Sequence, residues 1–184
     1  MNSDAIPDPD LTDVVTLRRA FGTFATGVTV VTVGGELVHG MTANSFTSVS
    51  LEPPLVLVCV ERQAVMHRSL MGVGTFGVSV LAADQEHIAR YFASRGRPLG
   101  PAQFDEVDWR PGRVTGAPLL DGALTRFECR LLRCYDGGDH SIFLGAVLSL
   151  ERCVDAEALL FLNGRFHRAT SATDVDLHRR EVRT

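Results

Sequence analysis

The sequence of 184 residues contains no lysine, and all 18 of its basic residues are arginine. Without lysine, the chain has no residue that forms a Schiff base, fills the lysine position of a P-loop or serves as a lysine general base. The formal net charge of −4 also gives no overall electrostatic reason to expect nucleic acid or an anionic membrane as a partner. Function classes that depend on a lysine are therefore excluded.

Several motifs of metal and hydrolytic sites are also missing. The four cysteines follow neither CxxC nor zinc-ribbon spacing, and the six histidines form no HExxH motif, so we predict no metal site. Ser79 lies in GVSVL rather than GxSxG, which leaves no nucleophile elbow. Asp105, Glu106 and Asp108 offer carboxylates, but an acidic loop of this kind is usually a solvated surface.

Long apolar runs are absent as well. None approaches the ~20 residues that a helix needs to cross a bilayer, so we expect no membrane partner. The N-terminal sequence MNSDAIPDPD is acidic and contains prolines, unlike the basic and apolar segments of a secretory signal. We therefore expect a cytoplasmic protein whose cysteines are reduced and mostly buried.

The length and the 45% apolar composition predict one globular domain. We place this domain at residues 12–168, with a flexible N-terminus at 1–11 and a C-terminal tail at 169–184. Three segments have features of helices. They are Thr12 to Ala25, capped at Thr12 or Asp13 and closed at Gly27; Val65 to Met71; and a helix capped by Asp84 that ends near Ala93.

Seven or eight segments have the β-branched, apolar or alternating patterns of strands. They are 28–33, 36–41 after a Gly34-Gly35 hairpin, 46–51, 55–60, 76–81, 124–135, 141–150 and 158–162. Residues 55–60 are apolar on both faces, which predicts a central strand, and 94–109 is predicted to be a long surface loop. Because the helices gather at the ends and in one crossover, we predict a mainly β, α+β fold: an antiparallel barrel with a few flanking helices.

The segment Gly72 to Gly77 matches GxGxxG letter for letter. A dinucleotide site needs a strand before these glycines and a helix after them, so that the pyrophosphate lies at the helix N-terminus. Here the predicted order is reversed, with the helix first and the strand second. We therefore interpret these glycines as a turn.

Two features are candidates for a site. The segment Gly40 to Ser45, GMTANS, combines a glycine that allows close approach with hydroxyl, amide and backbone groups that bind phosphate or a heterocycle edge. The same composition is also that of an ordinary polar turn. His140 begins a strand directly after a Gly-Gly turn, where its ring either reaches a pocket mouth or has a structural role.

Five spaced motifs then occur in order: FGTFATGVTVVT, GMTANSFTSVSLEPPLVLVCVER, FGVSVLAADQEHIARYFA, GGDHSIFLGAV and LLFLNGRFH. Together they resemble the short-chain flavin reductases, which have the FMN-binding split-barrel fold. The match spans residues 17–168, and five motifs in this order are more specific than any single pattern above. The resemblance implies an antiparallel split β-barrel and a homodimer that binds FMN or FAD between subunits.

The resemblance also implies site residues. Gly40, Met41 and Thr42 would line the isoalloxazine, while Asn44 and Ser45 would hold the ribityl chain or phosphate. Other positions are assigned to the same flavin and nicotinamide pocket: Cys59, Val60, Arg62 and Ala64; Arg90 and Phe92; His140, near the nicotinamide; and Gly164, Arg165 and Phe166.

One position departs from the family pattern. Relatives often have a hydroxyl residue where this chain has Ala64, so phosphate binding here would depend more on backbone N–H groups and Arg62. The choice between FMN and FAD is left open by this difference.

The implied function is an NAD(P)H:flavin oxidoreductase that supplies reduced flavin to a partner monooxygenase. Hydride passes from nicotinamide C4 to flavin N5, so the protein mainly has to stack two rings. His140 is the catalytic candidate, with a role either in orienting the nicotinamide or in protonating charge at the N1 side of the flavin. Two alternatives are a flavin-binding electron carrier without nicotinamide turnover and a stand-alone flavin-dependent oxidase or monooxygenase.

Overall fold

The structure is a computed structural model that describes residues 11–153 and 155–169. The predicted N-terminal segment and C-terminal tail therefore lie almost wholly outside the described residues. The helices and 3-10 turns of the described part are α1 (Val14–Gly22), η1 (Gly35–Leu37), α2 (Val65–Val73), η2 (Ala83–Gln85), α3 (Glu86–Ala93) and η3 (Gly100–Phe104). Its strands are β1 (Thr26–Gly27), β2 (Thr29–Val33), β3 (His39–Ala43), β4 (Thr47–Leu51), β5 (Pro54–Glu61), β6 (Thr75–Val80), β7 (Trp109–Pro111), β8 (Pro118–Leu120), β9 (Thr125–Gly137), β10 (His140–Arg152), β11 (Leu159–Leu162) and β12 (Arg165–Arg168).

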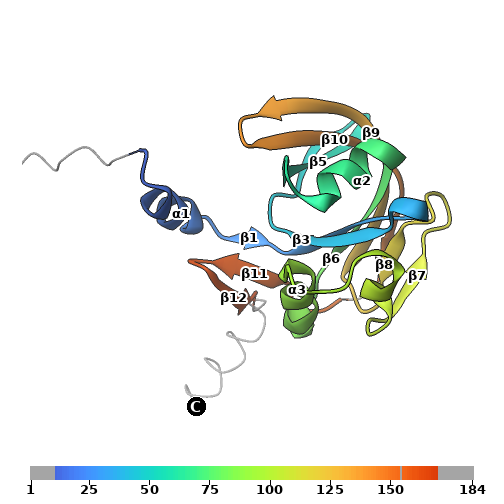
Figure 1. Ribbon diagram of the computed structural model, residues 1–184. Helices are drawn as coiled ribbons and strands as arrows, with labels where there is room; N and C mark the ends of the chain where they lie inside the picture. The colour runs from blue at the N-terminus through green and yellow to red at the C-terminus, as the bar shows by residue number, and fades with distance from the viewer. Residues whose placement is uncertain (1–10, 154, 170–184) are drawn as a thin grey trace, which may run out of the picture.

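A curved seven-stranded sheet forms the body of the molecule (Figure 1). Its strand order is β3-β2-β6-β9-β10-β5-β4, and every neighbouring pair is antiparallel. The two edge strands, β3 and β4, follow one another in the chain, so the sheet turns back on itself. The predicted mainly β fold with an antiparallel barrel and a few helices is confirmed.

The β2 strand lies wholly in the interior of the barrel. Its sequence, TVVTV, is β-branched throughout, and all five residues are buried. The strand from 55 to 60 differs from its prediction, because β5 lies beside the edge strand β4 rather than at the centre of the sheet. Val56, Val58 and Val60 point into the core, whereas Leu57 and Cys59 are only half-buried on the outer face.

Two helices cover the barrel, and each packs into a separate hydrophobic cluster of the core. Met66 and Leu70 on α2 pack with Val58 and Phe143 of the sheet. Phe92 on α3 packs in a second cluster with residues of β2, η3 and β11. The turn predicted at the GxGxxG match is confirmed, since α2 ends at Val73 and β6 follows a left-handed Gly74 with φ of +74°.

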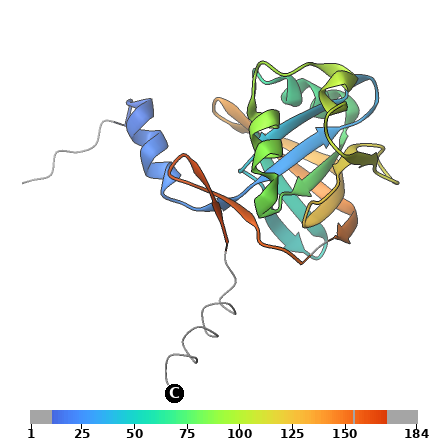
Figure 2. The ribbon, with the colours of Figure 1, turned by 90° about the horizontal axis from the view of Figure 1, so that it is seen from below.

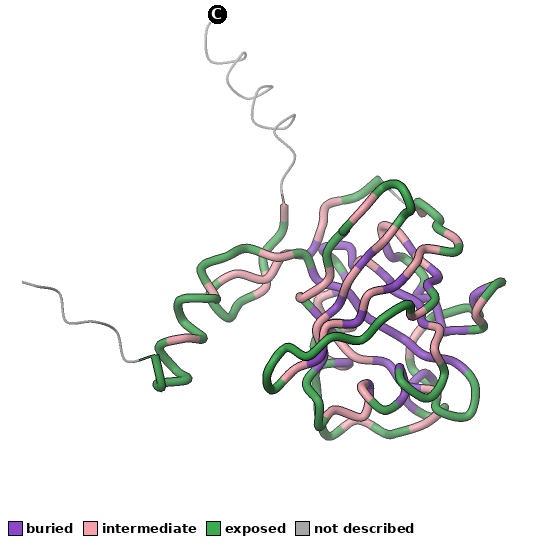
Figure 3. The backbone as a smooth tube through the Cα atoms, turned by 90° about the horizontal axis from the view of Figure 1, so that it is seen from above, coloured by how far each residue is buried: buried purple, intermediate pink, exposed green. Residues whose placement is uncertain are grey.

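An arm extends away from the barrel at the N-terminal side of the described chain (Figures 1 and 2). It consists of α1 and a small sheet in which β11 lies between β1 and β12. The predicted Asp13 cap is confirmed, because its carboxylate accepts from the N–H groups of Val15 and Thr16 at 3.0 and 3.2 Å. The predicted end at Gly27 is wrong: the helix ends at Gly22, and none of its residues is buried (Figure 3).

Three local predictions also differ from the structure. Gly34-Gly35 does not form a two-residue hairpin, because a 3-10 turn intervenes before β3. Asp84 does not cap α3, since the chain enters that helix through η2. The segment 94–109 contains η3, whose Gln103 and Phe104 are buried. Among the described residues, no helix is both long and apolar enough to cross a membrane.

Candidate functional site

A cavity of about 690 Å³ opens between β3, the turn that joins β5 to α2, the C-terminal end of α3 and the segment that follows α3. Three other cavities in the described part of the chain are smaller, with volumes of about 240 to 380 Å³. The residues that line it are His39, Met41, Thr42, Glu61, Gln63, Ala64, Val65, Phe92, Ala93, Arg95, Arg97 and Leu99.

The β3 wall of this cavity is held against α3. Thr42 donates from its hydroxyl to the carbonyl of Ala89 at 2.7 Å. Gly40 allows β3 to approach the aromatic cluster, because a Cβ there would lie 2.5 Å from Cε1 of Phe92 and 3.2 Å from Phe104. The glycine of GMTANS is therefore needed for close packing between β3 and α3.

His39 and Arg97 form the most unusual contact in the cavity wall. Arg97 donates from Nη2 to Nε2 of His39 at 3.1 Å and to the carbonyl of Gly40, and its Nη1 donates to the carbonyl of Ser94. Burial, followed by the charge of Arg97, lowers the pKa of His39 to about 4, so the ring is neutral near pH 7. Because Nε2 accepts, the ring proton is on Nδ1.

The same two side chains have unused donors. Nδ1 of His39 and Nε of Arg97 are buried and have no hydrogen-bond partner among the described residues. Burial lowers the pKa of Arg97, but a guanidinium remains protonated. No carboxylate within the described part of the chain pairs with Arg97, so none of the described residues neutralises this cation.

Gln103 holds the segment after α3 against β3. Its side chain is fully buried; Oε1 accepts from the N–H of Gly40 at 2.8 Å, and Nε2 donates to the carbonyls of Val38 and Gly100 at 3.3 and 2.8 Å. Sequence reasoning missed His39, Arg97 and Gln103. Their signal was faint: a histidine directly before GMTANS, and an arginine and a glutamine in a segment interpreted as loop.

Four of the residues assigned by resemblance line the cavity: Met41, Thr42, Ala64 and Phe92. Asn44 is exposed just beyond β3, and Val60 is buried in the core. Ser45 binds β5, since its hydroxyl donates to the carbonyl of Cys59 at 2.9 Å and accepts from its N–H at 3.1 Å.

The turn between β9 and β10 brings Arg62 and His140 together at the edge of this region. Arg62 pairs with Asp136 at 2.8 Å, and its backbone N–H donates to the carbonyl of Asp139. Nδ1 of His140 lies 2.8 Å from the Asp139 carboxylate. His140 also faces Glu61 in the β5–β10 register, so it borders the cavity without lining it.

The remaining assigned residues meet on another side of α3. The guanidinium carbon of Arg90 lies 4.9 Å from the centre of the Phe166 ring, and Arg90 pairs with Glu86 at 2.7 Å. Gly164 is in the turn between β11 and β12, and Arg165 begins β12. Within one chain none of these residues lines the cavity: Arg90 is on α3, and Gly164, Arg165 and Phe166 belong to the arm.

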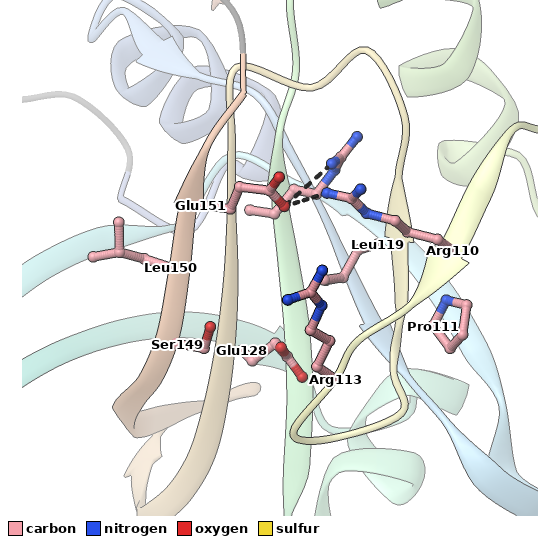
Figure 4. Close-up of a pocket in the computed structure, with 9 residues that line it drawn as sticks. Arg110, Pro111, Arg113, Leu119, Glu128, Ser149, Leu150 and Glu151 are labelled. Carbon is pink, nitrogen blue, oxygen red and sulfur yellow. Dashed lines mark hydrogen bonds and ion pairs between the residues drawn. The ribbon is translucent and has the colours of Figure 1, made fainter.

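A second, smaller cavity of about 340 Å³ lies between the β7–β8 hairpin and the strands β9 and β10 (Figure 4). Here Glu151 pairs with both Arg110 and Arg126, and Arg126 also pairs with Asp121 at 2.7 Å. The carboxylate of Glu128 accepts from the backbone N–H groups of Val114 and Thr115. At this cavity, Arg110 and Arg126 are thus paired with Glu151, and Glu128 is bound by backbone N–H groups.

Comparison with known proteins identifies the family. Residues 21–170 match the model of the flavin reductase like domain. The chain is 57% identical over 165 residues to an NADH-dependent FAD reductase of Streptomyces globisporus, which covers 90% of this chain and 91% of that protein.

Two solved structures are similar throughout the barrel. One is BorF, the flavin reductase component of a bacterial two-component tryptophan halogenase, with a TM-score of 0.84 and 59% identity over 86% of this chain and 99% of that one. Another is the NADH:FAD oxidoreductase SgcE6 of Streptomyces globisporus C-1027 in complex with NAD and FAD fragments. It has a TM-score of 0.83 and 56% identity, over 88% of this chain and 95% of that one. The chain therefore belongs to the flavin reductase like family.

Proposed function

We propose that this protein is an NADH-dependent flavin reductase that uses FAD or FMN and supplies the reduced flavin to a separate flavin-dependent oxygenase. The observation that supports this most strongly is the cavity beside GMTANS, in a chain more than half identical to an NADH-dependent FAD reductase. FAD is the preferred flavin in this proposal, because similar proteins that share more than half of their residues with this chain include an NADH-dependent FAD reductase and an NADH:FAD oxidoreductase, whereas an FMN reductase of the family is 42% identical.

The residues of the cavity fit a flavin. A volume of about 690 Å³ lies within the ~300–1,000 Å³ of small-molecule sites. Met41, Phe92 and Leu99 give an apolar lining for a ring system, and the unpaired guanidinium of Arg97 suits an anionic group. Ala64 and Val65 place the N-terminus of α2 at the cavity, where backbone N–H groups favour phosphate despite the missing hydroxyl.

A bound flavin would supply the redox chemistry by accepting hydride from the nicotinamide. The chain itself then has to hold two rings in contact and keep water out. Thr42, tied to Ala89, and Gly40, packed on Phe92, keep the β3 wall fixed for this purpose. No side chain has to act as an acid or a base for the hydride to pass.

His140 is proposed to orient the nicotinamide at the edge of the cavity. The ring is fixed by Asp139 and lies opposite Glu61, a residue of the cavity lining. His140→Ala should then raise the KM for NADH more than the KM for flavin. Equal kinetics in the variant and the wild type would leave His140 with a structural role only.

We also propose that the protein is a homodimer with flavin bound near the subunit interface. Large apolar residues are exposed on the barrel and on the arm: Leu51 is 90% exposed, Phe21 73% and Phe24 77%. Exposed apolar surface of this extent is typical of protein–protein contact. A second subunit would also bring another copy of the arm, with Arg165 and Phe166, to a barrel.

Sedimentation analysis tests this assembly. The wild type should sediment as a dimer, and joint replacement of Phe21 and Phe24 by serine should shift it toward monomer. A monomeric wild type at micromolar concentration would contradict the proposal. A cytoplasmic location is proposed with it, since all four cysteines are unpaired and NADH is the reductant.

Steady-state oxidation of NADH and NADPH, each with FAD, FMN or riboflavin, tests the proposed function. We expect turnover that requires added flavin and is faster with NADH than with NADPH. Flavin that binds without any nicotinamide oxidation would instead support an electron carrier. Product formed from an organic substrate without a second protein would support a stand-alone oxidase or monooxygenase.

A further inference from the structure

Arg97 and Arg126 are both at least partly buried, and each makes several contacts. The groups that surround their guanidiniums differ. Arg126 has carboxylates on two sides, whereas Arg97 is held by two backbone carbonyls and by Nε2 of His39. These contacts fix the position of the cation without neutralising its charge. A cation fixed in a cavity wall and left unneutralised favours an anionic ligand.

The unused donors beside it point to the same chemistry. Nδ1 of His39 and Nε of Arg97 are buried N–H donors without partners in the described chain, and His39 is only 4% exposed. A buried donor without a partner is costly, and such groups in native proteins usually have a ligand, ion or water to bind. This part of the wall offers donors and positive charge, and no side-chain acceptor remains free on either residue.

The support behind Arg97 is rigid. Gln103 joins the segment after α3 to the backbone on both sides of His39, through Val38 and Gly40. The guanidinium carbon of Arg97 lies 5.9 Å from the centre of the Phe92 ring. The cation is thus positioned before a ligand arrives, which reduces the entropy lost on binding.

We propose that Arg97, positioned by His39 and by the carbonyls of Gly40 and Ser94, binds a phosphate group of the nucleotide in this cavity. The inference depends on the proposed function, because the nucleotide is the flavin or the NADH of that reaction. It adds a second anion-binding point to the N-terminus of α2, which lines the same cavity. Two such points suit a nucleotide with a pyrophosphate.

Titration calorimetry on the full chain tests this, with binding rather than turnover as the readout. Riboflavin, FMN, FAD and NADH are titrated separately into the wild type and Arg97→Gln. Arg113→Gln is the matched control, because Arg113 lines the smaller cavity of Figure 4 and takes no part in the proposed site.

If Arg97 binds a flavin phosphate, Arg97→Gln should weaken FMN or FAD by about 10- to 100-fold, the effect of losing a charge-assisted contact, and leave riboflavin unchanged. If it binds the pyrophosphate of NADH, only NADH should weaken. Arg97→Lys, which keeps the charge, should recover much of the loss and thereby exclude misfolding as its cause.

Equal affinities in wild type and Arg97→Gln for all four ligands would overturn the inference and leave the proposed function intact. Equal weakening of riboflavin and FMN would also overturn it, because the lost contact would then be with the ring. Absence of flavin binding by the wild type would overturn both the inference and the proposed function.

Discussion

Two cavities of this barrel each contain an arginine that is held by several hydrogen bonds, and the groups around these two arginines differ. At the smaller one, Arg126 is 6% exposed and is paired with Asp121 and Glu151, while its Nε donates to the carbonyl of Leu120 at 2.6 Å. At the larger one, Arg97 contacts carbonyls and a neutral histidine and has no carboxylate partner among the described residues. Both arginine side chains are held in place, but only the charge of Arg97 is not balanced by a carboxylate of the described chain.

The difference distinguishes a structural arginine from one available to a ligand. The Arg126 network connects the β7–β8 hairpin to β9 and β10 through Arg110 and Glu151 (Figure 4). Arg126 itself is buried, whereas Asp121 and Glu151 are about half-exposed, so removing Arg126 mainly leaves the buried carbonyl of Leu120 without its donor. Removing the Arg97 side chain leaves mainly carbonyls at the edge of an open cavity. Stability should therefore depend on one arginine, and nucleotide affinity on the other.

The largest expected effect is on stability at the smaller cavity. Arg126→Gln should lower the free energy of unfolding by roughly 2–3 kcal/mol, because the buried Leu120 carbonyl loses a charged donor, while the half-exposed Asp121 and Glu151 add little. Its FAD affinity should equal that of the wild type. Urea denaturation and FAD titration of the same preparation measure both quantities.

Arg113→Gln is the control for this variant, since Arg113 is exposed at the same cavity. It should change stability by no more than about 0.5 kcal/mol. If Arg126→Gln lost FAD affinity and kept the free energy of unfolding of the wild type, Arg126 would be the ligand-binding arginine and the account of the two cavities would be wrong.

A smaller effect is expected where β3 packs on α3. Gly40→Ala should cost about 1–3 kcal/mol of stability, because the new Cβ would lie 2.5 Å from the Phe92 ring and the wall must move. The same movement should weaken FAD binding, unlike Arg126→Gln. Gly27→Ala is the matched control, since a Cβ there meets nothing within 4 Å. Equal stability of both variants would show that the β3 wall is not tightly packed.

The neutral state of His39 predicts a pH dependence. Its pKa is about 4 in the folded protein and 6.5 in a solvated reference, so the unfolded chain binds more protons between these values. Stability should therefore fall as the pH decreases from 6.5 to 4, by up to ~1.4 kcal/mol per pH unit from this group. Arg97 faces the ring and acts in the same direction.

Urea denaturation of wild type and His39→Gln across this pH range isolates the contribution of His39, because all carboxylates are common to both proteins. The wild type should lose stability more steeply on acidification. Parallel curves would mean that His39 is protonated as readily in the folded protein as in the unfolded one.

The smallest expected effect is at Ser45. Ser45→Ala should cost about 1 kcal/mol of stability, since its hydroxyl exchanges two hydrogen bonds with the backbone of Cys59. Its FAD affinity should change less than that of Asn44→Ala, because Asn44 is exposed and has a side chain free for the ribityl chain or phosphate. The reverse order of FAD affinities would place the Ser45 hydroxyl in the site.

Sequence reasoning predicted the barrel well because its signals are local. The β-branched run predicted as a strand at 28–33 is one example, since residues 29–33 form β2. It failed where packing decides: the apolar stripe of α1 has the period of a buried helix, yet Phe21 remains exposed on an arm. Periodicity reports which residues share a face and says nothing about what covers that face.

The site was predicted in part for a similar reason. The motif GMTANS marked one wall, and the structure places Met41 and Thr42 there. Another part of the wall is made by Arg97 and is supported by Gln103, which lie 57 and 63 residues after Gly40 in a segment without periodicity. Their importance comes from contacts with His39 and Gly40 that no spacing along the sequence encodes.

The central claim is that flavin binds in the cavity between β3, α2 and α3, and FAD titration of a variant that obstructs this cavity tests it most directly. Ala93 is exposed at the end of α3 and lines the cavity, so the side chain of Ala93→Trp should obstruct part of the space with little effect on folding. We expect the variant to lose at least about tenfold in FAD affinity, while its unfolding midpoint stays near that of the wild type. Unchanged FAD affinity in a folded Ala93→Trp protein would contradict the account and place the flavin elsewhere.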